Sequence, residues 1–139
     1  MFYTAGYIHD INVSMKLEVV KSSCSLYKLD EHREVPRSIY KSSFFNVTRT
    51  DNELSIICDN NVDMPCSTKL SDLKVIKVVP ITTSPGDICK LISLLNSVDI
   101  KYYAISTLDD NYIIVQDTFF ELLIQTVKKH GYNISGNID

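Results

Sequence analysis

The order of elements predicted between residues 74 and 134 constrains the fold of this chain more than any other feature. An apolar run, a helix, two β-rich runs, a second helix and a last short apolar run follow one another with clear boundaries. The β-rich runs span residues 102–115, and the turn between them reads Asp-Asp-Asn, a composition typical of a hairpin. This βαββαβ order is that of the ferredoxin-like plait, an α+β fold with an antiparallel sheet.

Both predicted helices carry start signals. The first has Ser84 as candidate N-cap, Pro85 at the first helical position and Asp87 at the third, residue types that suit the free backbone N–H groups of a helix start. The second has Thr118 and Glu121 in the spacing of a capping box. It is expected to end at a glycine that follows two lysines and a histidine.

The first half of the chain repeats this order in a degenerate form. Residues 16–29 read as one or two strands, residues 36–41 as a short helical turn, and residues 44–57 as a second hairpin with an Asp-Asn turn. The connection between the halves, residues 59–73, is polar, and a short helical segment is expected at residues 68–73. The repeat rests on element order, since the halves share little sequence identity.

We therefore predict two α+β units, each with an antiparallel sheet and helices on one face. The first, degenerate unit spans residues 15–73 and the second spans residues 74–139. Residues 1–14 are expected to be an N-terminal extension, because they show no sustained apolar periodicity. No Gly/Ser-rich linker separates the units, so they are expected to form one rigid body.

The composition excludes several classes of protein. With 139 residues, 45% hydrophobic and 22% charged, the chain has the balance of a globular protein. No apolar run approaches the roughly 20 residues of a membrane span, and the start of the chain does not read as a secretory signal, so a cytoplasmic protein is expected. A net charge of −3 without a basic cluster argues against nucleic-acid binding.

The chemistry-bearing residues give no sign of an enzyme. The four cysteines have no CxxC spacing and are expected to be reduced and buried, with neither a metal nor a disulfide. The histidines are scattered, and no serine or cysteine lies in a nucleophile motif. We therefore expect no catalytic residues, no cofactor and no metal. The residues considered are Cys24, Cys58, Cys66, Cys89, His9, His32 and His130.

Two blocks of sequence, FFNVTRTDNELSII and YYAISTLDDNYIIV, resemble the small tandem ACT-domain proteins, a group related to the cytosolic arginine sensors. The resemblance extends over residues 16–134, and the two blocks occur in the family's order. The chain departs from the family pattern at three positions. Asn111 stands where the family usually has Asp, Leu108 replaces a Tyr, and Asp87 replaces an apolar residue.

The resemblance implies a regulatory module that binds an amino acid or related metabolite at an interface between domains, through the loop after the first strand. The residues support this independently, because Gly86 allows close approach to the backbone and the start of a helix favours a carboxylate. The predicted ligand-binding residues are Ile81, Thr82, Thr83, Ser84, Gly86, Asp87, Ile105, Ser106 and Thr107.

Simpler interpretations stand beside these. A role as helix caps alone would explain Ser84 and Asp87. Ser106 and Thr107 are residue types that occur in strands without any function. Arg49 is either a solvated or Glu53-paired surface charge or a clamp for a carboxylate.

The function predicted from the sequence is that of a regulatory, homodimeric protein that senses an amino acid. The alternative is a module of the same fold that has lost its ligand and binds a protein partner through sheet edges or helices.

Overall fold

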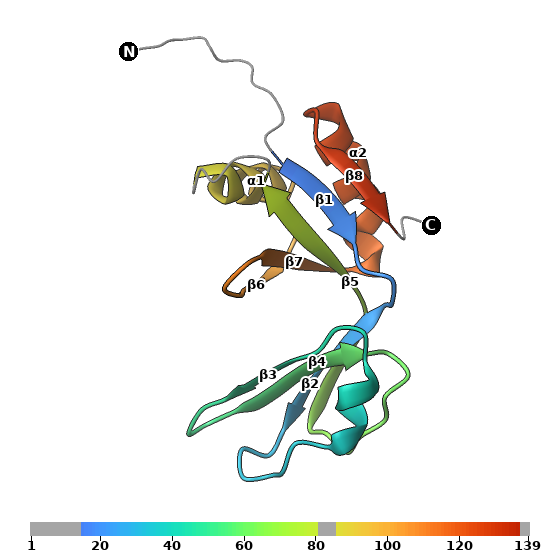
Figure 1. Ribbon diagram of the computed structural model, residues 1–139, viewed down its shortest axis with the longest axis vertical. Helices are drawn as coiled ribbons and strands as arrows, with labels where there is room; N and C mark the ends of the chain where they lie inside the picture. Colours follow the sequence, from blue (N-terminus) through green and yellow to red (C-terminus); the bar gives the residue numbers. More distant parts are fainter. Residues whose placement is uncertain (1–14, 81–85, 137–139) are drawn as a thin grey trace.

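The computed structural model describes residues 15–80 and 86–136, so the predicted N-terminal extension lies outside the described residues. The order β5-α1-β6-β7-α2-β8 confirms the predicted βαββαβ arrangement of the second half (Figure 1). The elements are β1 (Met15–Val19), β2 (Cys24–Leu29), η2 (Arg37–Lys41), β3 (Asn46–Arg49), β4 (Leu54–Asp59), β5 (Thr68–Pro80), α1 (Gly86–Ser97), β6 (Tyr103–Ser106), β7 (Asn111–Gln116), η3 (Asp117–Phe119), α2 (Phe120–Lys129) and β8 (Asn133–Gly136).

The long strand β5 joins the two halves of the molecule into one mixed sheet of eight strands (Figure 1). Its first part pairs with β2, from Thr68 opposite Lys28 to Leu73 opposite Cys24. Its second part pairs with β7 on one side and with β1 on the other. The predicted boundary at 73/74 therefore falls inside a continuous strand, at the point where the strand's partners change.

Each half has the strand order of a ferredoxin-like plait. We call β2, η2, β3, β4 and the first part of β5 the N-terminal unit, whose sheet order is β3-β4-β2-β5. We call β1, the rest of β5 and everything after it the C-terminal unit, whose order is β6-β7-β5-β1-β8. The sequence assigned β1 to the first unit, but β1 pairs antiparallel with β5 and parallel with β8, inside the second unit's sheet.

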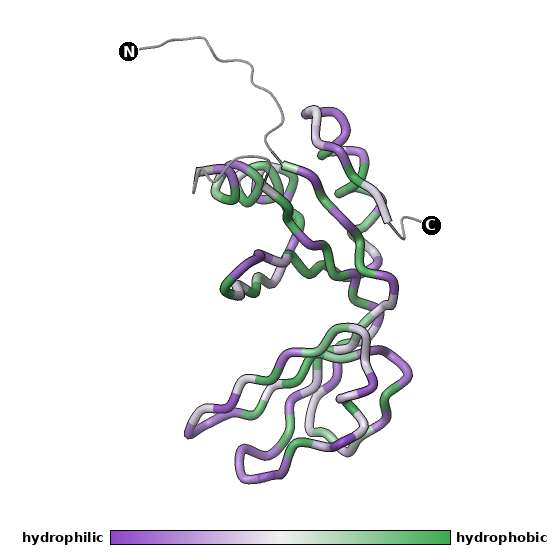
Figure 2. The backbone as a smooth tube through the Cα atoms, viewed as in Figure 1, coloured by the Kyte–Doolittle hydropathy of each residue, from purple (hydrophilic) through white to green (hydrophobic). Residues whose placement is uncertain are grey.

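Three apolar clusters hold these layers together. The first lies between the C-terminal sheet and α1 and α2, and it includes Leu95 and Leu123. The second lies under η2 on the outer face of the N-terminal sheet, around Ile39. The third lies where the inner faces of the two sheet regions meet, around Leu73 and Ile114. Apolar and polar residues alternate along many of the strands (Figure 2), and β2 and β4 each supply the second and the third cluster.

Two local predictions were wrong. Residues 68–73 are not helical but form the start of β5, because pairing with β2 outweighs a weak local preference. The Thr118–Glu121 capping box does not form: a 3-10 turn, η3, precedes α2, and the N-cap residue Phe119 makes no side-chain cap bond. The predicted end of α2 is confirmed, since Gly131 has φ of 85° after a basic last turn.

The helical turn at 36–41 and the hairpin at 44–57 are confirmed as η2 and as β3 with β4. No helix of the described part of the chain is long and apolar enough to cross a membrane.

Candidate functional site

The predicted ligand-binding residues come from two segments of the C-terminal unit. Residues 81–85, which hold Ile81, Thr82, Thr83 and Ser84, lie outside the described residues. Gly86 opens α1, and residues 105–107 lie at the end of β6.

Strand register places the turn between β6 and β7 at the end of the sheet where β5 ends. Ser106 pairs with Asn111, and Asn111 pairs with Val78 near the end of β5. The turn between β6 and β7 therefore lies at the sheet end from which β5 leads into α1.

Asp87 lies in the interior and not at an open rim. Only 5% of the surface of Asp87 is exposed to solvent. Burial raises the pKa of the Tyr132 hydroxyl, and the negative charge of Asp87 raises it further, so the two residues are electrostatic neighbours. Because Tyr132 precedes β8, this contact ties the start of α1 to the last connection of the unit. A ligand has little direct access to this carboxylate.

The hydroxyl groups of Ser106 and Thr107 close the turn between β6 and β7. Ser106 Oγ donates to Asn111 Oδ1 at 2.7 Å. Thr107 Oγ1 donates to the Asp110 carbonyl at 3.1 Å and accepts from the Asp110 N–H at 3.0 Å. Ile105 is half-buried and packs against the inner apolar cluster. These contacts give each residue a structural role, and the hydrogen bonds of Ser106 and Thr107 hold the turn in place.

Arg49 was expected to be solvated, paired with Glu53, or a carboxylate clamp. Instead its guanidinium donates to the backbone carbonyls of Glu31, at 3.0 Å, and of Arg33. The side chain thus holds the connection between β2 and η2. Glu53 accepts the hydroxyl of Ser55 at 2.7 Å.

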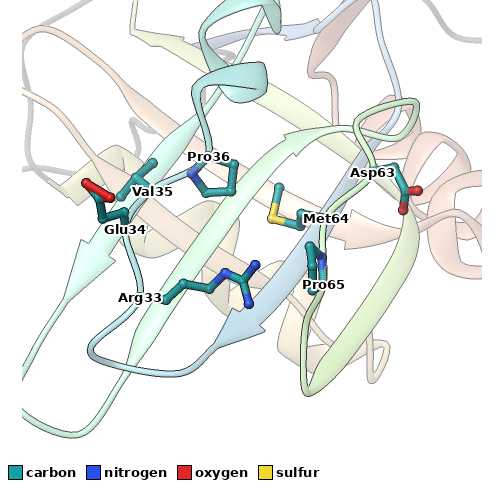
Figure 3. A pocket seen from close by; sticks show the side chains of 7 residues that line it. All are labelled: Arg33, Glu34, Val35, Pro36, Asp63, Met64 and Pro65. Atoms are coloured by element: carbon teal, nitrogen blue, oxygen red, sulfur yellow. The ribbon is translucent and has the colours of Figure 1, made fainter.

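A pocket of about 510 Å³ in the N-terminal unit was not predicted from the sequence (Figure 3). It lies between the β2–η2 connection and the β4–β5 connection. A second pocket, of about 380 Å³, lies between the inner face of this unit and β6. Two prolines line the first pocket, one in each connection. Its lining residues are Arg33, Glu34, Val35, Pro36, Asp63, Met64 and Pro65.

The cysteines were predicted to be buried, and this is correct for Cys24 and Cys58 and wrong for Cys66 and Cys89, which are exposed. Cys89 lies on the outer side of α1, and Cys66 on the exposed β4–β5 connection. Burial, with the charge of Asp59, raises the pKa of Cys24 to about 12 and that of Cys58 to about 11. The described residues contain no cluster of three or more metal-ligand side chains.

Sequence comparisons give little beyond the fold. A family model described only as that of an N-terminal domain matches residues 24–63, most of the N-terminal unit. No curated protein matches the chain significantly.

Solved structures resemble nearly the whole chain. Protein Atu0741 from Agobacterium tumefaciens is 22% identical, with a TM-score of 0.81 over 91% of this chain and 96% of that one. VC0802 from Vibrio cholerae, described as a possible transport protein, is 12% identical, with a TM-score of 0.65 over 85% and 91% of the two chains. An aspartate kinase from Clostridium acetobutylicum, described as an allosteric enzyme, is 13% identical, with a TM-score of 0.61.

The similarity to the kinase covers 91% of this chain and 37% of the kinase. At these identities the similarity concerns the fold alone. The chain has an ACT-like fold built from two ferredoxin-type units.

Proposed function

We propose that this protein is a regulatory module of the tandem ACT type that binds an amino acid or a related metabolite and has no catalytic activity of its own. The observation that carries the proposal is the strand register, which places the β6–β7 turn at the end of the C-terminal sheet where β5 ends. The ACT-like fold over both units supports it, as does the resemblance of the two sequence blocks.

The start of α1 supplies the chemistry for an anionic group. Its first backbone N–H groups have no partner within the helix, and the helix dipole places partial positive charge there. Gly86 lets a carboxylate approach the backbone of α1 at its first residue. The hydroxyl oxygens of Ser106 and Thr107 retain lone pairs that can accept a hydrogen bond from an ammonium group.

A thermal-shift screen over the amino acids tests this proposal. A ligand present at about 100 times its Kd should raise the free energy of unfolding by roughly 2.7 kcal/mol. Gly86→Val should remove that gain, because the new side chain occupies the space of the ligand. Leu108→Ser is the matched control, since Leu108 is fully exposed in the neighbouring turn. Stabilisation that survives in a folded Gly86→Val variant would place the ligand elsewhere, and silence across the panel would contradict amino-acid sensing.

We also propose that occupancy is transmitted through a homodimer in the cytoplasm. Among the described strands, β3, β6 and β8 each pair with a single neighbour and leave one edge free. The backbone groups of that edge can pair with a second copy of the chain. Light scattering after size exclusion should give twice the mass of 15.8 kDa. A monomeric mass with and without amino acids would contradict this mode of transmission.

A further inference from the structure

Strand β3 is an edge of the N-terminal sheet, and three exposed apolar side chains gather beside it. Among the described strands β3 pairs with β4 alone, so one of its edges is free (Figure 1). Phe45, which directly precedes β3, is 40% exposed, Val47 is 36% exposed, and Tyr40 of η2 is 62% exposed. The rings of Tyr40 and Phe45 meet edge to face, with their centroids 5.5 Å apart. We call these three side chains the β3 patch.

The β3 patch lies on the face of the sheet that η2 covers. Val47 pairs with Ile56, which belongs to the apolar cluster around Ile39. Opposed residues of an antiparallel pair point to the same face, and Phe45, two positions before Val47, shares that face. Arg49, two positions after Val47, donates to a carbonyl of the β2–η2 connection at 3.0 Å. One face of β3 therefore presents Phe45, Val47 and Arg49 in a row.

Hydrogen bonds of the β3–β4 hairpin show which backbone groups of β3 point to the free edge. The Thr50 N–H donates to the Glu53 carbonyl at 2.8 Å, across the turn that joins the two strands. Backbone groups alternate in direction along an antiparallel strand, so those of Asn46 and Thr48 also point to β4. The N–H and C=O groups of the odd-numbered residues point the other way. The row of exposed side chains thus directs its backbone donors and acceptors at the free edge.

The residues of β3 carry none of the usual protections of an edge strand, which are lysine, proline or a bulge. Residues 44–50 contain no lysine and no proline, and the register of β3 with β4 is continuous. The other edges expose small or polar side chains, namely Ala104 and Ser106 on β6 and Asn133 and Ser135 on β8. Of the three edges, β3 is therefore the one at which an added strand buries the most apolar surface.

A second copy of the chain is a self-complementary partner for this edge. An antiparallel pair of identical strands has two-fold symmetry, so a single register satisfies both copies. With the axis at Val47, each Val47 lies opposite its counterpart, and Phe45 lies opposite Arg49 of the partner subunit. This register opposes no like charges, and an arginine beside an aromatic ring is a favourable cross-strand pair. An axis at Thr48 would instead place Phe45 opposite Asp51 of the partner subunit.

We propose that two copies of this chain pair antiparallel through β3, with the two-fold axis at Val47. The odd-numbered residues 45–49 of each copy exchange backbone hydrogen bonds across the axis, and the two β3 patches join on one face of a continuous sheet. The inference rests on the homodimer proposed above. It assigns the dimer interface to the N-terminal unit, which does not contain the proposed ligand site.

Lysine substitutions on the three free edges test this assignment in the full chain, by light scattering after size exclusion. The parent should have twice the mass of 15.8 kDa, and Val47→Lys should have the single mass, because two ammonium groups would meet at the axis. Ala104→Lys on β6 and Ser135→Lys on β8 are the matched controls. Each places a lysine at an exposed position of another free edge, and both variants should remain dimeric.

Val47→Pro repeats the test by a different route, in case Val47→Lys does not fold. It removes an N–H that points away from β4, so the hairpin keeps its hydrogen bonds while the free edge loses a donor at the axis. This variant should also have the single mass.

Amide hydrogen exchange measured by NMR tests the register. In the parent, the amides of Phe45, Val47 and Arg49 should be protected together with those of Asn46 and Thr48. In Val47→Lys the odd-numbered amides should exchange at least about tenfold faster, while the amides that bond to β4 keep their protection. An alternating loss of this kind requires a strand that pairs at the free edge.

Several outcomes would overturn the inference. A dimer that survives Val47→Lys and is broken by Ala104→Lys or Ser135→Lys would keep the homodimer and move its interface to β6 or β8. A dimer that survives all three substitutions would place the interface away from the strand edges. A monomeric parent with unprotected odd-numbered amides would contradict the homodimer itself. A monomeric parent with these amides protected would show that another part of the same chain covers β3.

Discussion

The two units of this molecule share a strand order but differ in how their outer faces are covered. Among the described residues, the apolar cluster between the C-terminal sheet and its two helices has fourteen buried members, whereas the cluster between the N-terminal sheet, the 3-10 turn η2 and the loops has seven. A smaller apolar core contributes less stability, since the stabilisation scales with the apolar area buried. The difference indicates that the same strand arrangement can be covered either by two helices or by a single turn and loops.

Polar anchors compensate for the smaller core of the N-terminal unit. Asn60 accepts the hydroxyl of the buried Ser25 at 2.6 Å and donates to Asp72 at 2.8 Å. Asp72 has φ of 59°, a left-handed conformation that aspartate tolerates better than most residues. The network lies beside the register shift between β2 and β5, where the sheet passes from one unit to the other. Specific hydrogen bonds thus position the part of the molecule that helices do not cover.

The largest effect is expected from truncating the helical core. Leu123→Ala, on the buried face of α2 where the residue is 1% exposed, should lower the free energy of unfolding by about 2–5 kcal/mol. Ile39→Ala, at the fully buried residue of η2, should fall at the lower end of that range, because the neighbouring loops can partly close the cavity. Leu122→Ala, at an exposed neighbour on α2, should change it by less than about 0.5 kcal/mol.

Urea denaturation followed by far-UV circular dichroism measures these differences. Because β5 belongs to both sheets, both core variants should shift one cooperative transition. Two separate transitions, with Ile39→Ala affecting only the weaker one, would show that the units unfold independently.

An intermediate effect is expected at the anchor of the β4–β5 connection. Tyr27→Phe removes the hydroxyl that donates to the Val62 carbonyl and should cost about 1 kcal/mol. Hydrogen exchange should rise in residues 60–67 and remain unchanged in α2, where no bond is lost. Tyr40→Phe is the control, because Tyr40 is 62% exposed. Equal exchange in the parent and the Tyr27→Phe variant would mean that the packing of Met64 and the other hydrogen bonds of this connection hold it without the Tyr27 hydroxyl.

Local sequence patterns predicted most of the fold. Period-two and helical stripes correctly placed both helices and the strands apart from the start of β5, since these elements depend on neighbours close in sequence. The insertion of β1 between β5 and β8 could not be predicted, because pairing between residues so far apart leaves no local trace. The start of α2 was missed for a similar reason. The path of the chain after β7 leads into the 3-10 turn η3, and this turn stands where a side-chain cap was predicted.

The candidate sites were less accessible to sequence reasoning. Ser106 and Thr107 were predicted to bind the ligand, and the structure shows that their hydroxyl groups make hydrogen bonds within the β6–β7 turn. The pocket around Arg33 and Met64 was missed, because its residues lie in two polar connections that alone suggest only exposed loops. A signal was present in the length of the β4–β5 connection, which is too short for the helix that a complete plait requires.

The two buried thiols are expected to have the smallest effect on stability at neutral pH. At high pH they should have a distinct effect. The pKa of Cys24, raised from 9.0 to about 12, and that of Cys58, raised to about 11, favour the neutral thiol in the folded protein. In the unfolded chain these thiols ionise near pH 9. Their contribution to stability is therefore fully present below about pH 9 and is lost as the pH rises toward 11 and 12.

Urea denaturation between pH 8 and pH 10.5 should show this loss, and the loss should be shallower in Cys24→Ala, which lacks one of the two groups. Tyrosines and lysines also titrate in this range, so the comparison with the variant isolates the thiol. A maleimide should label Cys66 and Cys89 in the folded protein, one exposed thiol in each unit, and label Cys24 and Cys58 only on unfolding. Fast native labelling of Cys58 would show that the thinner cover of the N-terminal unit opens far more readily than that of the helical unit, because Cys58 lies in the cluster beneath η2.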